Sequence, residues 1–144
     1  MASGRNGERG LRLFVVDDSG GEWTELTSGD KRTVRIASPD LQQARRARGR
    51  IRDDVSVILD VTVLVTADLR SASRWMSAQD TEATATLYYA GTVDGLAGLI
   101  ADIFVAGVAD GVTLISASTQ QDLRALADAA LARIARRLPV ARAA

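Results

Sequence analysis

Residues 55–66 read VSVILDVTVLVT and form the strongest strand signal in the chain. A nearly continuous run of β-branched and other apolar side chains is typical of a strand buried on both faces of a parallel sheet. Asp60 interrupts this run. Because a buried carboxylate is costly unless it is paired, we expect Asp60 to face a partner, water or a cavity, and Arg35 on the neighbouring predicted strand is the candidate partner. A structural ion pair or a solvated barrel position is the preferred interpretation over a catalytic role.

Further strands and helices are predicted on either side of this strand. The other strands are expected at 11–16, 33–37 and 111–116, and helices at 22–28, 39–52, 68–78, from 92 onward and from 119 onward. Strands that alternate with helices indicate an α/β protein with parallel strands and right-handed crossovers. A complete eight-stranded βα barrel takes about 250 residues, whereas this chain has 144. The sequence therefore predicts about four βα units in a parallel half-barrel that resembles the second half of a TIM barrel.

Helix ends and turns are predicted from single residues. Ser38, Thr92 and Thr119 precede helical patterns and are expected to be N-caps, because a short polar side chain can accept a hydrogen bond from a free backbone N–H of the first turn. Gly107 follows a helical pattern and is expected to adopt positive φ there. Gly111 is expected to let the chain turn tightly into its strand.

Composition excludes several kinds of chemistry. The chain has no cysteine and no histidine, which rules out disulfides, thiol nucleophiles, Cys or His metal ligands and a Ser-His-Asp triad. Eighteen basic residues balance eighteen acidic ones, so we expect no nucleic-acid partner and no membrane partner. The arginines of the predicted helix 39–52 are interpreted as a solvated outer face, since no aromatic residues interleave with them.

The domain organisation is simple. Residues 1–10 are expected to be a flexible tail, 11–138 one domain and 139–144 a C-terminal tail. No apolar stretch approaches the about 20 residues of a membrane span, and the first residues lack the apolar core of a signal peptide. A cytoplasmic protein is therefore expected.

Residues 91–116 read GTVDGLAGLIADIFVAGVADGVTLIS. This segment resembles the C-terminal part of the luciferase-like, flavin-dependent monooxygenases (the bacterial luciferase superfamily). In that family a Gly-Thr opens the penultimate helix and Ala-Asp-Gly leads into the last barrel strand; here these are Gly91-Thr92 and Ala109-Asp110-Gly111. The resemblance extends over about residues 11–138 and is most specific at 91–116.

The resemblance implies an oxidoreductase that uses FMN or a deazaflavin. In the family, the loop after the corresponding upstream strand contacts the cofactor phosphate, which places Ser19, Gly20 and Gly21 as the candidate cofactor-binding residues. Backbone N–H groups in such a loop, followed by a helix N-terminus, suit a phosphate. Tyr88 and Tyr89 could stack on a ring, although packing is the preferred interpretation of both.

The resemblance covers only the second half of the family's barrel. It implies a monooxygenase-family protein that is truncated and inactive alone, because the first four strands supply most of the flavin-ring contacts. A half-barrel leaves two open sheet edges and an exposed concave side. We therefore expect a homodimer or a complementary N-terminal-half chain as partner. The alternative is a non-catalytic half-barrel assembly module, or a gene remnant, that acts through protein–protein contact.

Overall fold

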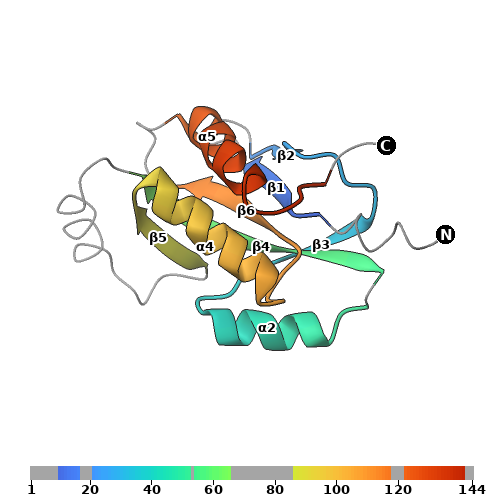
Figure 1. The fold of residues 1–144 in the computed structure, drawn as a ribbon. Helices are drawn as coiled ribbons and strands as arrows, with labels where there is room; N and C mark the ends of the chain where they lie inside the picture. The colour runs from blue at the N-terminus through green and yellow to red at the C-terminus, as the bar shows by residue number, and fades with distance from the viewer. Residues whose placement is uncertain (1–9, 17–20, 53, 66–85, 118–121, 142–144) are drawn as a thin grey trace.

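The computed structural model describes residues 10–16, 21–52, 54–65, 86–117 and 122–141, which form a mixed α/β fold with one curled sheet (Figure 1). Six strands make up the sheet in this part of the chain. They are β1 (Arg12–Val16), β2 (Trp23–Glu25), β3 (Arg32–Ile36), β4 (Val55–Val65), β5 (Leu87–Gly91) and β6 (Gly111–Ser116). The helices are α2 (Leu41–Gly49), α4 (Val93–Val105) and α5 (Leu123–Ala135). The predicted helix 68–78 lies outside the described residues.

The strand order is β2-β1-β6-β4-β3, and β5 pairs with the second half of β4. The pairs β1–β6, β6–β4, β4–β3 and β4–β5 are parallel, whereas β2 is antiparallel to β1. The mixed α/β class is thus confirmed, but the strands differ from four uniform βα units. Strands arranged in chain order would place β1 beside β3; instead, β1 pairs with β6, the middle strand of the order, and β3 lies at the end away from β1.

The predicted helix 22–28 is wrong, because its first residues form β2. Trp23 pairs with Val16, and Glu25 with Phe14, in an antiparallel hairpin with β1. Trp and Thr favour strands, and the backbone N–H of Leu26 continues the pairing by donating to the carbonyl of Leu13 at 2.8 Å. Hydrogen bonding to the edge of β1 therefore outweighs the weak helical spacing of Trp23 and Leu26.

Two helix starts also differ from the prediction. Asp40, not Ser38, is the N-cap of α2 and accepts a hydrogen bond from the backbone N–H of Gln43 at 2.8 Å. Asp122 is the N-cap of α5, and Thr119 lies outside the described residues. At both starts an aspartate stands nearer the helix than the predicted cap, and its carboxylate reaches the third residue of the helix.

The two predicted ends of α4 are confirmed. Thr92 is its N-cap and accepts from the backbone N–H of Gly95 at 3.2 Å. Gly107 follows the C-cap with φ of 75°, which is a conformation that favours glycine.

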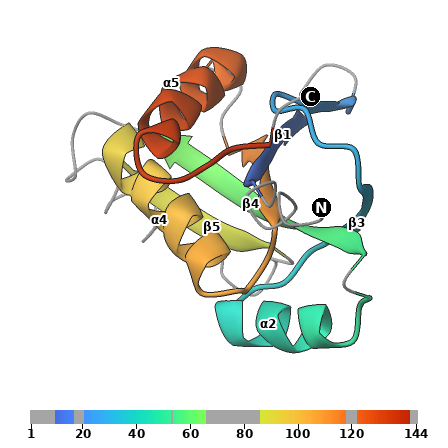
Figure 2. The same ribbon diagram turned by 45° about the vertical axis from the view of Figure 1, so that its right-hand side comes forward.

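The three described helices share one face of the sheet (Figures 1 and 2). Alternate residues of β4, from Val57 to Val63, are fully buried in an apolar cluster with side chains of all three helices, Ala44 of α2 included. The intervening β4 residues point to the opposite face, because successive strand residues alternate. That opposite face, which no described helix covers, is called the concave face below.

A buried ion pair anchors the loop after β2. The guanidinium of Arg12 donates to both carboxylate oxygens of Glu25, at 2.9 and 2.7 Å, and to the carbonyl of Lys31 at 2.8 Å. Glu25 also accepts from the hydroxyl of Thr27 at 2.6 Å and from the backbone N–H of Gly29 at 3.1 Å. Burial alone would raise the pKa of Glu25, but hydrogen bonds, that from Arg12 foremost, lower it below its ordinary value of 4.5.

Residues 139–141, after α5, also pair with the main body of the fold. The backbone N–H of Leu11 donates to the carbonyl of Pro139 at 3.0 Å, and that of Ala141 donates to Leu11 at 2.9 Å. The carbonyl of Ala141 accepts from Ser28 at 2.8 Å. Within the described part of the chain, no helix is both long enough and apolar enough to cross a lipid bilayer.

Two glycines of the Gly91-to-Gly95 segment make room for Tyr89. The Tyr89 hydroxyl donates to the carbonyl of Thr92 at 2.8 Å, and a Cβ at Gly91 or Gly95 would overlap that hydroxyl. Burial raises the pKa of Tyr89 above its ordinary value of 10.0. Tyr89 is therefore partly buried and packs against the apolar core, and packing is the preferred interpretation from the sequence.

Gly95→Ala should destabilise the chain relative to Gly98→Ala, although both lie inside α4. An alanine normally stabilises a helix interior by about 1 kcal/mol over glycine, and Gly98→Ala, which meets only the end of the Arg137 side chain, should show that gain. Gly95→Ala should lose it, since the Tyr89 hydroxyl must move. In a Tyr89→Phe background the two substitutions should become equivalent in urea unfolding. A full gain for Gly95→Ala in the unmodified chain would contradict this packing.

Candidate functional site

Polar side chains occupy the centre of the concave face, where a purely apolar packing would be expected. Phe14 of β1, Thr113 of β6 and Asp60 of β4 are direct neighbours across three adjacent strands. Thr113 is fully buried, and Asp60 is 8% exposed. A buried polar group is stable only when it is hydrogen-bonded, so the partners of these two residues define the site.

Asp60 is paired with Arg35, as expected from the sequence. The Arg35 Nε donates to Asp60 Oδ1 at 2.7 Å. Arg35 reaches Asp60 diagonally, because in the β3–β4 register it stands opposite Ile58. The carboxylate is thus held by a cation on the next strand, which suits an ion pair better than a free general base.

Trp23 connects three of the strands over this centre. Its ring stacks on Phe14, with centroids 4.3 Å apart and planes 12° from parallel. Its indole N–H donates to Thr113 Oγ1 at 2.8 Å. The guanidinium carbon of Arg35 lies 5.7 Å from the centroid of the Trp23 ring, within the range of a cation–π contact.

The contact between Trp23 and Arg35 shows how strongly the sheet curls. Trp23 is on β2 and Arg35 is on β3, at the two ends of the strand order. In a flat sheet these ends would be about 19 Å apart, at about 4.8 Å for each of the steps between neighbouring strands. The curl brings the ends within side-chain reach, so the concave side is covered at its centre by Trp23 and Arg35, not fully exposed as expected.

Thr113→Val should cost about 1–3 kcal/mol of unfolding free energy, although the two side chains have the same shape. The substitution leaves the part-buried indole N–H of Trp23 without its acceptor, and an unsatisfied buried donor costs up to about that amount. Urea unfolding and near-ultraviolet circular dichroism measure the effect. Thr24→Val, on β2 with its side chain on the opposite face from Trp23, is the control and should be nearly neutral. Equal effects of the two substitutions would contradict the role of Thr113.

Of the candidate cofactor residues, Ser19 and Gly20 lie outside the described part of the chain. Gly21 is exposed just before β2, with φ of 67°, and a Cβ there would meet open space. Positive φ explains the glycine as a turn residue. The structure does not bring Gly21 into a hydrogen-bonded cluster with the concave face, and β2 stands where a helix N-terminus was expected.

Sequence reasoning missed Trp23 as part of the site. The hairpin that directs it onto the concave face joins strands of different length and requires the Val16–Trp23 register. The signal that could have found it is the strand-like alternation of Trp23, Thr24 and Glu25 after Gly20-Gly21. Read as a strand, that pattern places Trp23 and Glu25 on the same face.

The Ala109-Asp110-Gly111 segment has a packing role at the amino ends of the strands. Asp110 accepts from Arg48 of α2 at 2.7 Å and from the backbone N–H of Val57 at 2.9 Å. Its own backbone N–H donates to Val57 at 2.8 Å, and its carbonyl accepts from Arg12 at 3.2 Å. One aspartate therefore ties α2, β1 and β4 to the start of β6.

Gly111 does not make the tight turn that was expected. It is the first residue of β6, paired with Arg12 of β1 and Ile58 of β4, and its φ is not positive. A Cβ here would overlap the backbone carbonyl of Arg12. Glycine is needed for the close approach of two backbones.

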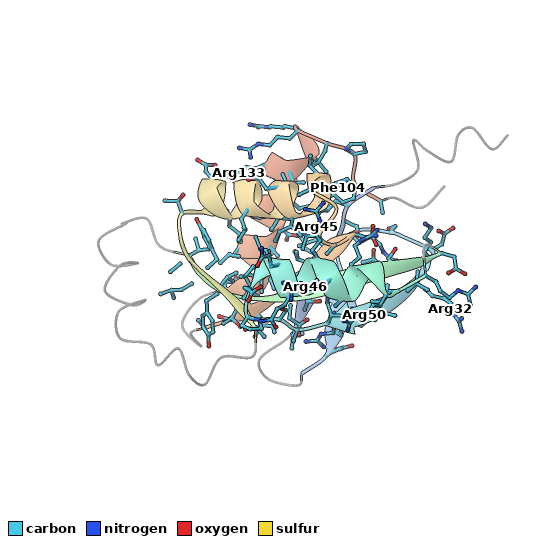
Figure 3. All side chains as sticks on the ribbon, turned by 90° about the horizontal axis from the view of Figure 1, so that it is seen from below. Arg32, Arg45, Arg46, Arg50, Phe104 and Arg133 are labelled. Atoms are coloured by element: carbon cyan, nitrogen blue, oxygen red, sulfur yellow. The ribbon has the colours of Figure 1, made fainter. Side chains whose placement is uncertain are left out.

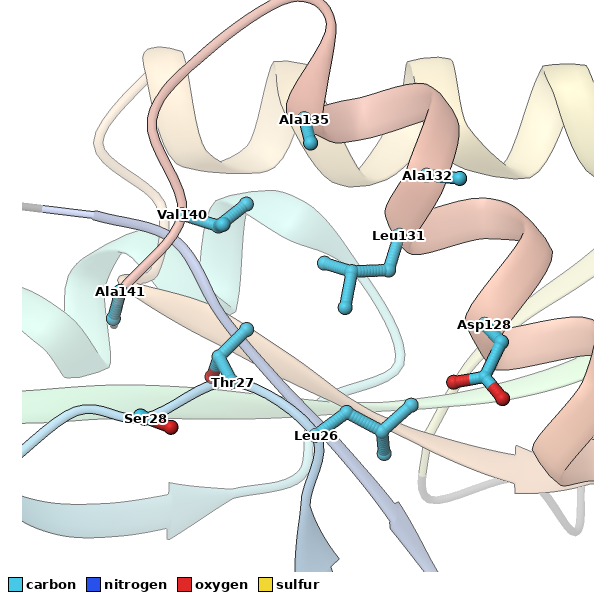
Figure 4. Close-up of a pocket in the computed structure, with 9 residues that line it drawn as sticks. All are labelled: Leu26, Thr27, Ser28, Asp128, Leu131, Ala132, Ala135, Val140 and Ala141. Atoms are coloured by element: carbon cyan, nitrogen blue, oxygen red, sulfur yellow. The ribbon is translucent and has the colours of Figure 1, made fainter. Parts of the chain in front are cut away.

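A hollow of about 320 Å³ lies on the other side of the molecule, beside α5 (Figure 4). Its walls are mostly apolar side chains of α5, of the residues after β2 and of the C-terminal segment, with Leu26, Leu131 and Val140 pointing inward. Asp128 is the one charged residue in its described lining. A carboxylate repels a phosphate, so this hollow does not suit the phosphate of a flavin nucleotide.

Comparisons with known proteins return no family. No protein-family model matches the sequence, and no curated protein matches it significantly. What the geometry itself defines is a mixed α/β domain with a curled sheet, helices on one face and a polar, aromatic cluster on the other.

Proposed function

We propose that this chain is a luciferase-like member of the flavin-dependent monooxygenases, which binds FMN or a deazaflavin and has no oxidoreductase activity alone. The observation that carries the proposal is the concave face: helices cover one side of the curled sheet, and Trp23, Arg35, Asp60 and Thr113 gather on the other. In a βα barrel this face is the interior. The proposal includes the arrangement of the strands as a half-barrel that resembles the second half of a TIM barrel.

The described residues fit the ring of a flavin better than its phosphate. One face of the Trp23 ring stacks on Phe14 and the Arg35 guanidinium lies over the ring, so a planar flavin ring would stack on that guanidinium and on the part of Trp23 that stays accessible. For the phosphate, Gly21 offers open space, but Glu22 follows it and no helix begins there. We therefore place the ring against the concave face and derive no chemical step through the cofactor.

The side chains of this cluster support binding more than turnover. Asp60 is held by Arg35, and the chain has no histidine. A bound flavin needs water to be excluded from its reactive side, and the described residues cover the concave face only at its centre. Activity would therefore require residues of a second chain.

The β3 edge is the proposed place for that second chain. Among the described strands, β3 pairs only with β4, whereas the other end of the sheet terminates in the antiparallel β2. In a homodimer that joins at this edge, a twofold axis normal to the sheet would make the β3 strands of the two copies antiparallel to each other. A continuous parallel barrel thus favours a complementary N-terminal-half chain over a homodimer, although both remain outcomes of the test.

The test is the thermal stability and the solution mass of the purified chain with and without FMN. Saturable stabilisation by FMN, and a weaker effect of riboflavin if the phosphate contributes, would support the proposal. Asp128→Asn, in the remote hollow, is the control and should leave the stabilisation unchanged. No stabilisation at millimolar FMN would overturn flavin binding by this chain.

The second candidate function is a non-catalytic half-barrel assembly module. One observation favours it: Trp23 and Arg35 already cover the centre of the concave face in the chain alone. A stable complex with a partner chain that forms equally well with and without FMN would support this function. Reductase-coupled substrate oxidation by the isolated chain would exclude it.

A further inference from the structure

Helix α2 carries a concentration of arginines that the fold uses only in part. Arg48 pairs with Asp110, and Arg52, beyond the helix, pairs with Asp54. Arg45, Arg46 and Arg50 are exposed, as is Arg32 at the start of β3, and none of the four has an ion pair within the described part of the chain. Figure 3 shows Arg45, Arg46 and Arg50 along α2, with Arg32 beyond the end of the helix.

This arrangement is unfavourable for the isolated chain. Arg46 and Arg50 stand four residues apart, so they lie on the same side of the helix, where like charges repel. Cations near a helix C-terminus are favoured by the helix dipole, which accounts for basic residues in the last turn but not for Arg45 or Arg32. The balanced net charge of the chain is a sum over the whole molecule and does not remove this local excess.

The outward side of α2 is also mainly polar. Apart from Leu41 at its start, which is 37% exposed, its exposed residues are glutamines, arginines and Gly49, and Ala44 is its one buried residue. A protein–protein interface needs an apolar centre, whereas nucleic-acid interfaces are polar and strongly positive. Guanidinium groups bind phosphates through paired hydrogen bonds, and glutamine can donate to the same backbone.

α2 is accessible to a large ligand. It lies below α4 and α5, alongside the first part of β4, in both views of the ribbon (Figures 1 and 2). Its axis extends about 13 Å at about 1.5 Å per residue. No other described helix stands over its outward side in these views.

We propose that the α2 surface, formed by Arg32, Arg45, Arg46 and Arg50, binds the phosphate backbone of a nucleic acid without reading its sequence. The binding is electrostatic, so its affinity falls steeply with salt. This function is independent of flavin binding, because the concave face lies on the other side of the sheet from α2.

The test measures fluorescence anisotropy of a labelled short DNA duplex titrated with the chain at several salt concentrations. The variant Arg45→Gln/Arg46→Gln/Arg50→Gln keeps helix propensity, since Gln and Arg are similar in this respect. Its matched control, Arg124→Gln/Arg136→Gln/Arg137→Gln, removes the same charge from exposed positions on and after α5. Circular dichroism checks that both variants fold.

The unmodified chain should bind saturably at low salt, and the α2 variant should bind at least about tenfold more weakly. The logarithmic slope of affinity against salt should fall by about 0.9 for each phosphate that the variant no longer neutralises, while the α5 control changes affinity by less than about threefold. Equal decreases in both variants, or no saturable binding at low salt, would overturn the proposal. The proposal would also be overturned if polyglutamate displaced the labelled duplex at a lower concentration than unlabelled duplex does. That result would indicate an acidic protein partner instead.

Discussion

Gly111→Ala should destabilise the folded chain by about 3 kcal/mol or more, the upper end of what overpacking causes. The new methyl group would overlap the Arg12 carbonyl oxygen. Relief requires β1 and β6 to separate, since the obstacle is backbone and cannot rotate away. That pairing continues from Arg12–Gly111 to Val16–Ile115, so its distortion would disturb the centre of the sheet. Urea unfolding followed by circular dichroism measures the loss.

Gly49→Ala is the matched control for this prediction. A Cβ at Gly49, the last residue of α2, would meet no atom within 4 Å. Alanine should therefore be neutral or stabilising by up to about 1 kcal/mol. If Gly111→Ala were as well tolerated as Gly49→Ala, the close approach of β1 and β6 would be wrong.

Arg12→Met should cost about 3–5 kcal/mol, the range for removing one partner of a buried ion pair. Methionine replaces the stem of the arginine but leaves the Glu25 carboxylate without its cation, with only 18% of that side chain exposed. The carbonyl of Lys31 also loses its donor. The double variant Arg12→Met/Glu25→Gln should recover part of the loss, because it leaves no uncompensated charge. No recovery in the double variant would mean that Arg12 acts through packing alone.

The pH dependence of stability provides an independent check of the same pair. The pKa of Glu25 is lower in the folded chain than its ordinary value of 4.5. The carboxylate therefore contributes its full stabilisation above that value, and the contribution disappears as the pH falls through the lower, folded pKa. The stability difference between the chain and Glu25→Gln should accordingly be constant near neutral pH and shrink below about pH 4.5. A difference that grows on acidification would contradict the ion pair.

The sequence predicted the central strand and its charged residue well. β4 was expected over 55–66, and the Asp60–Arg35 pair followed from the cost of a lone buried carboxylate, because both arguments depend on local pattern and on short-range electrostatics. The ends of α4 were also predictable, since Thr92 and Gly107 act within one turn of the helix.

Strand order and the aromatic part of the site were not predictable in the same way. β1 lies beside β6, which is about a hundred residues away in the chain, and nothing in the local pattern of either strand specifies that pairing. β2 was mistaken for a helix because three residues carry little periodicity. With β2 misassigned, the position of Trp23 over Thr113 could not be derived. Gly111 was assigned to a tight turn, although the close approach of the β1 backbone is the reason for a glycine there.

The concave face, with Trp23 beside Arg35, is the proposed wall of a flavin site. Its most direct test is the quenching of FMN fluorescence on titration with the purified chain, compared with the variants Trp23→Leu and Thr24→Val, whose side chains lie on opposite faces of β2. We expect saturable quenching that Thr24→Val preserves and that Trp23→Leu weakens at least about tenfold, the factor for about 1.4 kcal/mol of lost stacking. Quenching that does not saturate, or that is the same for the folded Trp23→Leu variant, would contradict it.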